Sequence, residues 1–438
     1  MPELFFIFAI KKPMKLNLFF IFKLFVITSQ LIAQPLNPWT PPEYFPSKAV
    51  LIEWDFNSST WSLYSELIEQ SSLAVPVILV VNNLTEENQM RSLLTTDGVS
   101  LANISFVHVP CERMWIRDHG PLAVMTDNGV AYIDFDDLAN SGLDEDLPTN
   151  LALAWGLQSY QLPYIFCGGN FMVNSHNTLF TTTRVYTNNS SYSQSVIDNV
   201  FETYMGITDI VTFKAQHSDY WGHIDMQIKL LDDTTFIISS VTLGSGPNYD
   251  SLEANYNKLL TLTGPHGKPY RIQKIPMADN WKTYANSVIL NNTVLIPFFN
   301  HVLDSNAYNI YQQLLPSYTI VGINSNAIIG WEGSLHCITM QLFDDSTVNI
   351  IESLSVRDDV FSLYPNPLQS GGLLHVLLSM DRVETAVVNI YDLNGKLLQS
   401  ENILNGQSFS IEWTHPAGKY LVEVVTQEGK FVKNLIGL

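Results

Sequence analysis

Four residues in three separate motifs have the side chains needed to process a guanidinium group. The motifs are Trp115-Ile-Arg-Asp118-His-Gly-Pro, Tyr220-Trp-Gly-His223-Ile-Asp225 and Gly333-Ser-Leu-His-Cys337. A guanidinium is planar and stays protonated at physiological pH, and carboxylates bind it through paired hydrogen bonds. We therefore interpret Asp118 and Asp225 as two carboxylates that hold such a cation flat and leave its central carbon open to attack.

The thiol of Cys337 is the candidate nucleophile, and the imidazole of His223 is the candidate acid and base. His336 directly precedes the cysteine, and neighbours in an extended segment face opposite sides, so we do not expect His336 to be the base. Carboxylates beside a thiol raise its pKa, and a bound cation would cancel their field. Substrate binding should therefore activate Cys337. Taken alone, a buried cysteine that only packs is the simpler interpretation.

His223 and Asp225 are two residues apart, so they share one side of an extended strand. A zinc site is one alternative use of this spacing, but the sequence has no second histidine or cysteine motif of the kind that zinc sites use. A core histidine that Asp225 merely orients is a second alternative. We therefore predict neither a metal nor a cofactor.

Composition indicates an exported, acidic protein. The 438 residues have a formal net charge of −20, which argues against nucleic acid and anionic membranes as partners. Such a charge would attract a cationic substrate, although acidity alone is more often a solubility trait. Residues 1–34 are typical of a signal peptide, with Lys15, a mostly apolar run and a small-residue cleavage site at Ala33. No later segment is apolar enough to span a membrane. We expect a secreted or cell-surface location.

An odd number of cysteines leaves at least one thiol free in an exported protein. The three are Cys111, Cys167 and Cys337. Cys111 and Cys167 could pair or could both be buried thiols.

Residues 35–355 alternate apolar strand patterns with helical patterns, which predicts an α/β domain. The expected strands include 49–54, 77–81, 106–109, 130–133, 236–238 and 287–290, and the expected helices are 59–71, 86–94, 193–205, 252–263 and 307–315. Residues 356–438 alternate with period two between turn signals such as Asn394-Gly395, which predicts a small β-sandwich without chemistry of its own.

The first of these domains resembles the Porphyromonas-type peptidyl-arginine deiminases and the agmatine deiminases. The motifs that carry the resemblance are Pro41-Pro-Glu43, Trp54, Trp115-x-Arg-Asp118-x-Gly-Pro, Cys167-Gly-Gly169-Asn170, Gly222-His223-x-Asp225, Tyr284-Ala-Asn286 and His336-Cys337-x-Thr339-x-Gln341. It implies a five-fold pseudo-symmetric α/β propeller of ββαβ modules with a central site. It also implies that a guanidine is hydrolysed to a ureido group and ammonia without metal or cofactor.

Site roles follow from the resemblance by matching position. It implies that Asp118 and Asp225 bind the guanidinium, that His223 is the acid and base, and that Cys337 is the nucleophile. The expected substrate-binding residues are Trp115, Tyr220, Gly169, Asn170 and Asn286. For the two aromatic residues, ordinary core packing is the alternative.

Two departures from the resembling family concern the substrate. Relatives usually have an Asp-Gly pair after the two glycines, and Asn174-Ser175 stands at the corresponding positions here. Peptidyl-arginine members use arginines on the loop after the first catalytic strand to receive a carboxylate. The corresponding loop here, expected at residues 134–146, instead carries Asp136, Asp137, Asp144, Glu145 and Asp146. Such a loop would suit a cationic tail or an internal arginine in a basic peptide.

The C-terminal stretch Tyr364-Pro-Asn-Pro367, Tyr391-Asp-Leu-Asn-Gly395 and Pro416-Ala-Gly418-Lys-Tyr420 resembles a sorting domain of the type nine secretion system. The resemblance implies export through that machinery as a partner, with the domain removed or used for surface attachment.

Several functions remain open at this point. The first hypothesis is a peptidyl-arginine deiminase that acts outside the cell. An agmatine deiminase that yields N-carbamoylputrescine is its close rival. A thiol protease and a non-catalytic guanidine-binding surface protein are further alternatives, although a protease would not explain two flanking aspartates.

Overall fold

The computed structural model describes residues 34–137, 142–217, 219–243, 248–265, 267–278, 281–343, 361–369, 371–378, 385–392, 397–404, 408–426 and 429–437. The expected signal peptide therefore lies almost entirely outside the described residues. Among the described residues, no helix is long and apolar enough to cross a membrane.

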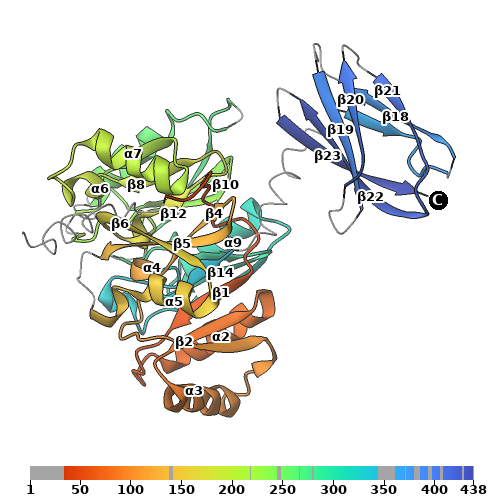
Figure 1. Cartoon of the computed structure of the whole chain (residues 1–438). Coiled ribbons are helices and arrows are strands. Elements are labelled where there is room, and N and C mark those ends of the chain that lie inside the picture. Colours follow the sequence, from red (N-terminus) through yellow and green to blue (C-terminus); the bar gives the residue numbers. More distant parts are fainter. Residues whose placement is uncertain are drawn as a thin grey trace, which may run out of the picture.

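Five sheets make up the described part of residues 34–343, and four of them share one strand pattern (Figure 1). Each of these four sheets consists of three consecutive strands. The first contains β4 (Leu122–Thr126), β5 (Gly129–Asp137) and β6 (Gln158–Phe166), and the second contains β7 (Met172–Val173), β8 (Thr178–Thr182) and β9 (Asp209–Phe213). The third contains β10 (Ile228–Asp232), β11 (Thr235–Ser240) and β12 (Arg271–Pro276), and the fourth contains β13 (Val288–Leu290), β14 (Thr293–Phe298) and β15 (Thr319–Asn324). In each, the first two strands are antiparallel and the last two are parallel.

Helices connect the parallel strands of each sheet, as a parallel connection requires. They are α5 (Leu147–Trp155), α6 (Arg184–Thr187) with α7 (Gln194–Met205), α8 (Asn248–Leu259) and α9 (Asp304–Leu314). Each of these four sheets with its helix is one ββαβ module.

The fifth sheet joins the two ends of this region. The parallel strands β1 (Ala49–Glu53), β2 (Val77–Val81) and β3 (Ile104–His108) are connected by α2 (Trp61–Ala74) and by α3 (Leu84–Thr96) with the short turn η1 (Leu101–Asn103). The late strand β16 (Met340–Leu342) pairs antiparallel with β1. The α/β architecture with five ββαβ units is thus confirmed.

The helix limits follow from local chemistry. Asn83 caps α3, because its side chain accepts from the backbone N–H groups of Thr85 and Glu86, so the helix begins two residues before the expected start. Gly206 ends α7 in the left-handed conformation that glycine adopts most easily. Every residue of β1 is buried, which explains its apolar run Ala49–Ile52.

The C-terminal region forms two antiparallel sheets, as expected for a β-sandwich (Figure 1). One contains β17 (Phe361–Tyr364), β18 (Leu373–Leu378) and β21 (Ser408–Glu412); the other contains β20 (Leu397–Leu404), β19 (Thr385–Asp392), β22 (Gly418–Thr426) and β23 (Gly429–Gly437). Its separate core includes the fully buried Trp413.

Candidate active site

The predicted site residues come from the connections between consecutive sheets. Asp118 lies on the short helix α4 (Ile116–His119) between β3 and β4, and Gly169 lies in η3 (Gly168–Asn170) between β6 and β7. The next three connections carry His223 with Asp225, Asn286 and Cys337 in that order. All five connections therefore contribute, which accounts for the wide spacing of the motifs along the chain.

Cys337 lies between an amide and a carboxylate. Its Sγ is 3.3 Å from Nδ2 of Asn286 and 3.8 Å from Oδ2 of Asp225, and all three residues are buried. Asn286 also positions the loop, because its Oδ1 accepts from the backbone N–H of His336 at 3.1 Å. The nucleophile candidate is thus held next to one of the two predicted guanidinium binders.

One oxygen of Asp225 is available for a ligand. Oδ2 accepts a hydrogen bond from Nδ1 of His336 at 2.6 Å, whereas Oδ1 is buried and has no hydrogen-bond partner in the described part of the chain. A buried carboxylate oxygen without a partner is unfavourable. A guanidinium N–H bound at this oxygen would remove that cost.

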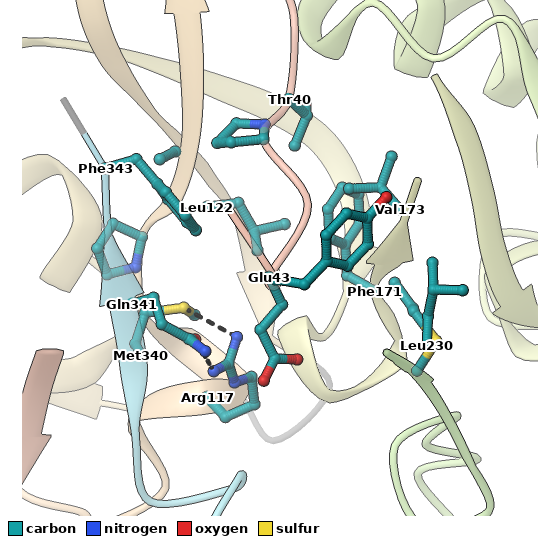
Figure 2. A pocket seen from close by; sticks show the side chains of 15 residues that line it. Thr40, Glu43, Arg117, Leu122, Phe171, Val173, Leu230, Met340, Gln341 and Phe343 are labelled. Atoms are coloured by element: carbon teal, nitrogen blue, oxygen red, sulfur yellow. Dashed lines mark hydrogen bonds between the residues drawn. The ribbon is translucent and has the colours of Figure 1, made fainter. Parts of the chain in front are cut away.

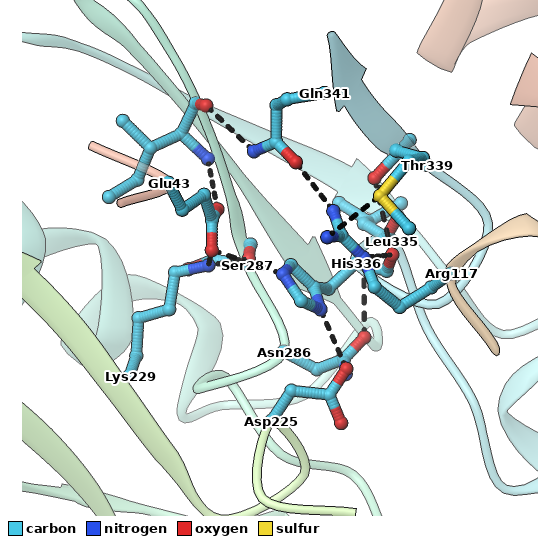
Figure 3. Close-up of polar contacts among 12 residues, drawn as sticks. Glu43, Arg117, Asp225, Lys229, Asn286, Ser287, Leu335, His336, Thr339 and Gln341 are labelled. Atoms are coloured by element: carbon cyan, nitrogen blue, oxygen red, sulfur yellow. Dashed lines mark hydrogen bonds and ion pairs between the residues drawn. The ribbon is translucent and has the colours of Figure 1, made fainter. Parts of the chain in front are cut away.

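His336 belongs to a buried network that the sequence did not predict (Figure 3). Its Nε2 lies 3.0 Å from Oε2 of Glu43, while Nζ of Lys229 lies 2.5 Å from Oε1 of the same glutamate and donates to the carbonyl of Ser287 at 2.6 Å. Both ring nitrogens of His336 are therefore engaged by carboxylates, Asp225 on one side and Glu43 on the other.

The second aspartate lies near a different thiol. Oδ1 of Asp118 is 3.9 Å from Nε2 of His223, and the same nitrogen is 2.8 Å from Sγ of Cys167. All three cysteines are free, so Cys111 and Cys167 do not pair. Cys167 is thus a direct partner of the predicted acid and base, a role that the sequence interpretation did not assign to it.

Burial and charge control the protonation of the site. Burial raises the pKa of the Cys337 thiol well above its usual range, and the nearby carboxylates of Asp225 and Asp118 raise it further. For Asp225, burial alone would raise the pKa, but the hydrogen bond and charge of His336, with His223 and Arg117, hold it below its usual value. The resting site therefore has a carboxylate beside a protonated thiol.

Arg117 holds the Cys337 loop in place through hydrogen bonds. Its backbone N–H donates to the carbonyl of Cys337 at 3.1 Å, and its guanidinium donates to the carbonyl of His336 at 3.3 Å and to Gln341 Oε1 at 2.5 Å. Figure 2 shows a small pocket that Arg117 and Glu43 share with mostly apolar residues. Neither predicted guanidinium binder lines this pocket, nor do His223 and Cys337, so it is separate from the chemistry.

The predicted substrate-binding residues divide into two groups. The ring of Trp115 packs directly on Gly333, so it borders the Cys337 loop, and Asn286 contacts the thiol itself. By contrast, the Tyr220 side chain is 65% exposed. Gly169 and Asn170 lie in the connection that packs against His223. A Cβ at Gly169 would lie 2.8 Å from Nδ1 of His223, and the Asn170 side chain accepts from the backbone N–H of Thr182.

Asn174, one of the two departures, lies in the hairpin turn between β7 and β8. Its Oδ1 accepts from the backbone N–H groups of His176 and Thr178, and its Nδ2 donates to the hydroxyl of Tyr270 at 3.2 Å. These hydrogen bonds give Asn174 a structural role in the turn.

The acidic segment 134–146 is only partly a loop, because β5 extends to Asp137. Asp134 is buried, and its carboxylate accepts from the Thr149 hydroxyl; burial raises its pKa to about 6. Asp144 is also buried, with its oxygens accepting from the backbone N–H of Glu112 and from Arg113 Nε. Asp134 and Asp144 are therefore unavailable to a cationic tail. Of the five acidic residues expected on the loop, the structure removes Asp144, which corrects the expectation that all five face the substrate.

Comparisons with known proteins agree with this geometry. Residues 39–342 match the family described as Porphyromonas-type peptidyl-arginine deiminase. The chain belongs to this family. Its members are deiminases, hydrolases that act on carbon–nitrogen bonds of guanidines. Residues 362–437 match the secretion system C-terminal sorting domain, which indicates export to the cell surface or the medium.

Several bacterial proteins of similar sequence are provisionally named agmatine deiminases. One from Legionella pneumophila is 24% identical over 341 residues, covering 69% of this chain and 94% of its own. One from Yersinia pseudotuberculosis is 23% identical over 353 residues, covering 69% of this chain and 94% of its own.

Solved structures show the same fold. The agmatine deiminase of Enterococcus faecalis aligns with a TM-score of 0.63 at 18% identity and covers 70% of this chain and 96% of its own. A protein from Porphyromonas gingivalis, provisionally named arginine deiminase, aligns with a TM-score of 0.63 at 24% identity. The alignment covers 69% of this chain and 98% of that protein.

Proposed function

We propose that the chain is an exported peptidyl-arginine deiminase, which converts the guanidinium of an arginine side chain into a ureido group and ammonia. The observation that carries the proposal is the position of Cys337, buried beside the amide of Asn286 and the carboxylate of Asp225, whose Oδ1 has no hydrogen-bond partner among the described residues. The sorting domain supports a protein or peptide substrate, because export brings the enzyme to extracellular proteins.

Two aspartates bind the cation. Asp225 offers its free oxygen, and Asp118 offers a carboxylate near His223. A guanidinium between them would receive charge-assisted hydrogen bonds, which are about twice as strong as neutral ones. The same cation offsets the negative field that raises the Cys337 pKa, so the thiol releases its proton to solvent when substrate binds.

The chemistry then takes two displacements. The Cys337 thiolate bonds to the central carbon, and protonated His223 gives its proton to the nitrogen that leaves as ammonia, which breaks one C–N bond. A thiouronium cation remains on Cys337. Water then attacks the same carbon while His223 accepts a proton from it. The C–S bond breaks, the thiolate is regenerated, and the remaining hydroxyl proton converts the ammonia to ammonium.

Agmatine is the second candidate substrate, because the curated relatives carry that name. The same four residues would perform the same steps, and only the group bound to the guanidinium would differ. The buried state of Asp134 and Asp144 removes part of the case for a cationic tail, so it favours the peptide slightly.

One assay separates the functions. The purified protein is incubated with an internal-arginine peptide, agmatine or free arginine, and both ammonia and the organic product are measured beside Cys337→Ala. Peptidyl-citrulline together with ammonia supports the proposal, and N-carbamoylputrescine supports the second candidate. Peptide cleavage without citrulline would indicate a protease, and guanidine binding without turnover would indicate a surface binder. Either result would overturn the proposal.

A further inference from the structure

A second cluster of ionisable side chains lies next to the site and is not used by the proposed chemistry. Glu53 ends β1, His119 ends α4, and Asp144 ends η2 (Gly142–Asp144). All three side chains are buried, with Glu53 and His119 each 1% exposed and Asp144 fully covered. One donor atom from each residue lies within 4.8 Å of the other two.

The cluster is incompletely satisfied by protein groups. Glu53 Oε2 lies 3.1 Å from Nε2 of His119, but Glu53 Oε1 is buried and has no hydrogen-bond partner within the described ranges. The Cys111 thiol also interacts with this carboxylate through a side-chain hydrogen bond, yet Oε1 itself has no partner among the described residues. An isolated buried carboxylate oxygen is costly, so such a group is usually paired or coordinates a metal.

The separations suit coordination of one ion. Two atoms bound tetrahedrally to zinc, at bond lengths of about 2.0 to 2.1 Å, lie about 3.3 Å apart. The 3.1 Å between Glu53 Oε2 and His119 Nε2 is close to this value. One imidazole and two carboxylates are donors that first-row divalent metals accept. From these observations we propose that Glu53, His119 and Asp144 bind a divalent ion of the Zn²⁺ type.

Neighbouring groups define the environment of the ion. The carboxylate of Asp144 accepts hydrogen bonds from the backbone N–H of Glu112 at 2.7 Å and from Arg113 Nε at 3.0 Å. These two donors would hold the carboxylate in place while it binds the ion. An ion bound by both carboxylate oxygens of Glu53 would also satisfy Oε1, but it would not satisfy Nδ1 of His119, which has no partner among the described residues.

The ion would act as a structural anchor for the substrate-binding helix. His119 directly follows Asp118 on the four-residue helix α4, and Glu53 belongs to the central strand β1. A metal that joins them would fix α4 against the fifth sheet and so fix the carboxylate of Asp118. Metal binding itself does not depend on the proposed deiminase activity.

The test is the metal content of the full-length protein, produced in zinc-supplemented medium and measured by elemental mass spectrometry. We expect about one zinc per chain in the wild type, and at least a ten-fold loss in Glu53→Gln and in His119→Gln. His108→Gln is the matched control, because that histidine is exposed and pairs with Glu87. Cys167→Ala is a second control, because it disrupts the other cluster that could hold a metal, formed with Asp118 and His223. Both controls should keep the zinc.

Two results would overturn the proposal. One is a wild-type protein with less than a tenth of an equivalent of any first-row metal. The other is metal that persists in both ligand variants but disappears in Cys167→Ala. If the ligand variants do not fold, the wild-type content and the Cys167→Ala content decide the question by themselves. The two proposals fail separately. Ammonia release by a protein without zinc would overturn only the metal site, and bound zinc without ammonia release would overturn only the proposed function.

Discussion

The thiol of Cys167 lies 2.8 Å from Nε2 of His223, so the predicted acid and base is held by a cysteine other than the nucleophile. The same imidazole nitrogen faces Asp118 at 3.9 Å. His223 therefore stands between a thiol and a substrate-binding carboxylate, and its orientation depends on both.

Removing the Cys167 thiol should impair the chemical step more than substrate binding. We expect Cys167→Ala to lower kcat about ten-fold, which corresponds to about 1.4 kcal/mol of transition-state stabilisation, with little change in KM. Cys167→Ser should recover part of the loss, because a hydroxyl can also hydrogen-bond to the imidazole. Steady-state kinetics on the preferred substrate check this. Equal losses in both variants, with a lowered melting temperature, would instead indicate a packing role.

The raised pKa of Cys337 predicts slow alkylation of the free enzyme at neutral pH. Only the thiolate reacts, and a raised pKa keeps the thiol protonated until the pH is high. Asp225→Asn removes the carboxylate nearest the thiol, so alkylation at pH 7 should become several-fold faster. Iodoacetamide labelling with site-resolved mass spectrometry measures the rate at Cys337 and, as an internal reference, at Cys111. A slower reaction in Asp225→Asn would contradict this electrostatic interpretation.

The Glu43 carboxylate should contribute stability that depends on pH. Burial opposes its ionisation, but Lys229 and His336 hold its pKa well below the usual value. A lowered folded-state pKa gives stability that is complete above the unfolded pKa and is lost as the pH falls through the folded pKa. Glu43→Gln leaves Lys229 buried without its anion, which costs about 3 to 5 kcal/mol at pH 7.

Urea unfolding at several pH values measures this difference. The gap between wild type and Glu43→Gln should be largest near neutral pH and should shrink in acid, below the ordinary range of a glutamate. A gap that stays constant down to that range would mean that the carboxylate charge does not stabilise the fold.

The space at Gly169 should be essential for His223. An added Cβ would lie 2.8 Å from Nδ1 and 3.0 Å from Cγ of the imidazole, too close for a real contact. Gly169→Ala should therefore displace the ring and lower kcat at least ten-fold. Gly330→Ala is the matched control, because a Cβ there meets nothing within 4 Å and should leave kcat unchanged. Similar activity in the two variants would mean that the position of His223 is not critical.

The sequence predicted the elements with strong local signals and the residues within recognisable motifs. The strand 49–54 and the helix 193–205 have continuous or periodic apolar residues, and both are observed. The contact between Glu43 and Lys229 joins positions 186 residues apart, so no local pattern could indicate it. The Pro41-Pro-Glu43 motif marked the segment as part of the family, but it carried no information about what the glutamate binds.

The second thiol shows the same limit. The sequence left Cys167 either as a disulfide partner of Cys111 or as a buried thiol, and its family motif assigned the thiol no role. Only the folding of two inter-sheet connections against each other places it beside His223. In the same way, the acidic segment appeared uniform in sequence, whereas packing removes Asp134 and Asp144 from the surface.

The central claim is that Cys337 forms a covalent bond to the guanidinium carbon. The most direct measurement is an acid quench of the enzyme during turnover, followed by peptide mapping of the adduct by mass spectrometry. We predict a substrate-derived amidine on Cys337, absent from Cys337→Ala, which should also release no ammonia. Continued ammonia release by Cys337→Ala, or turnover without any adduct on Cys337 when the quench is fast, would contradict the account.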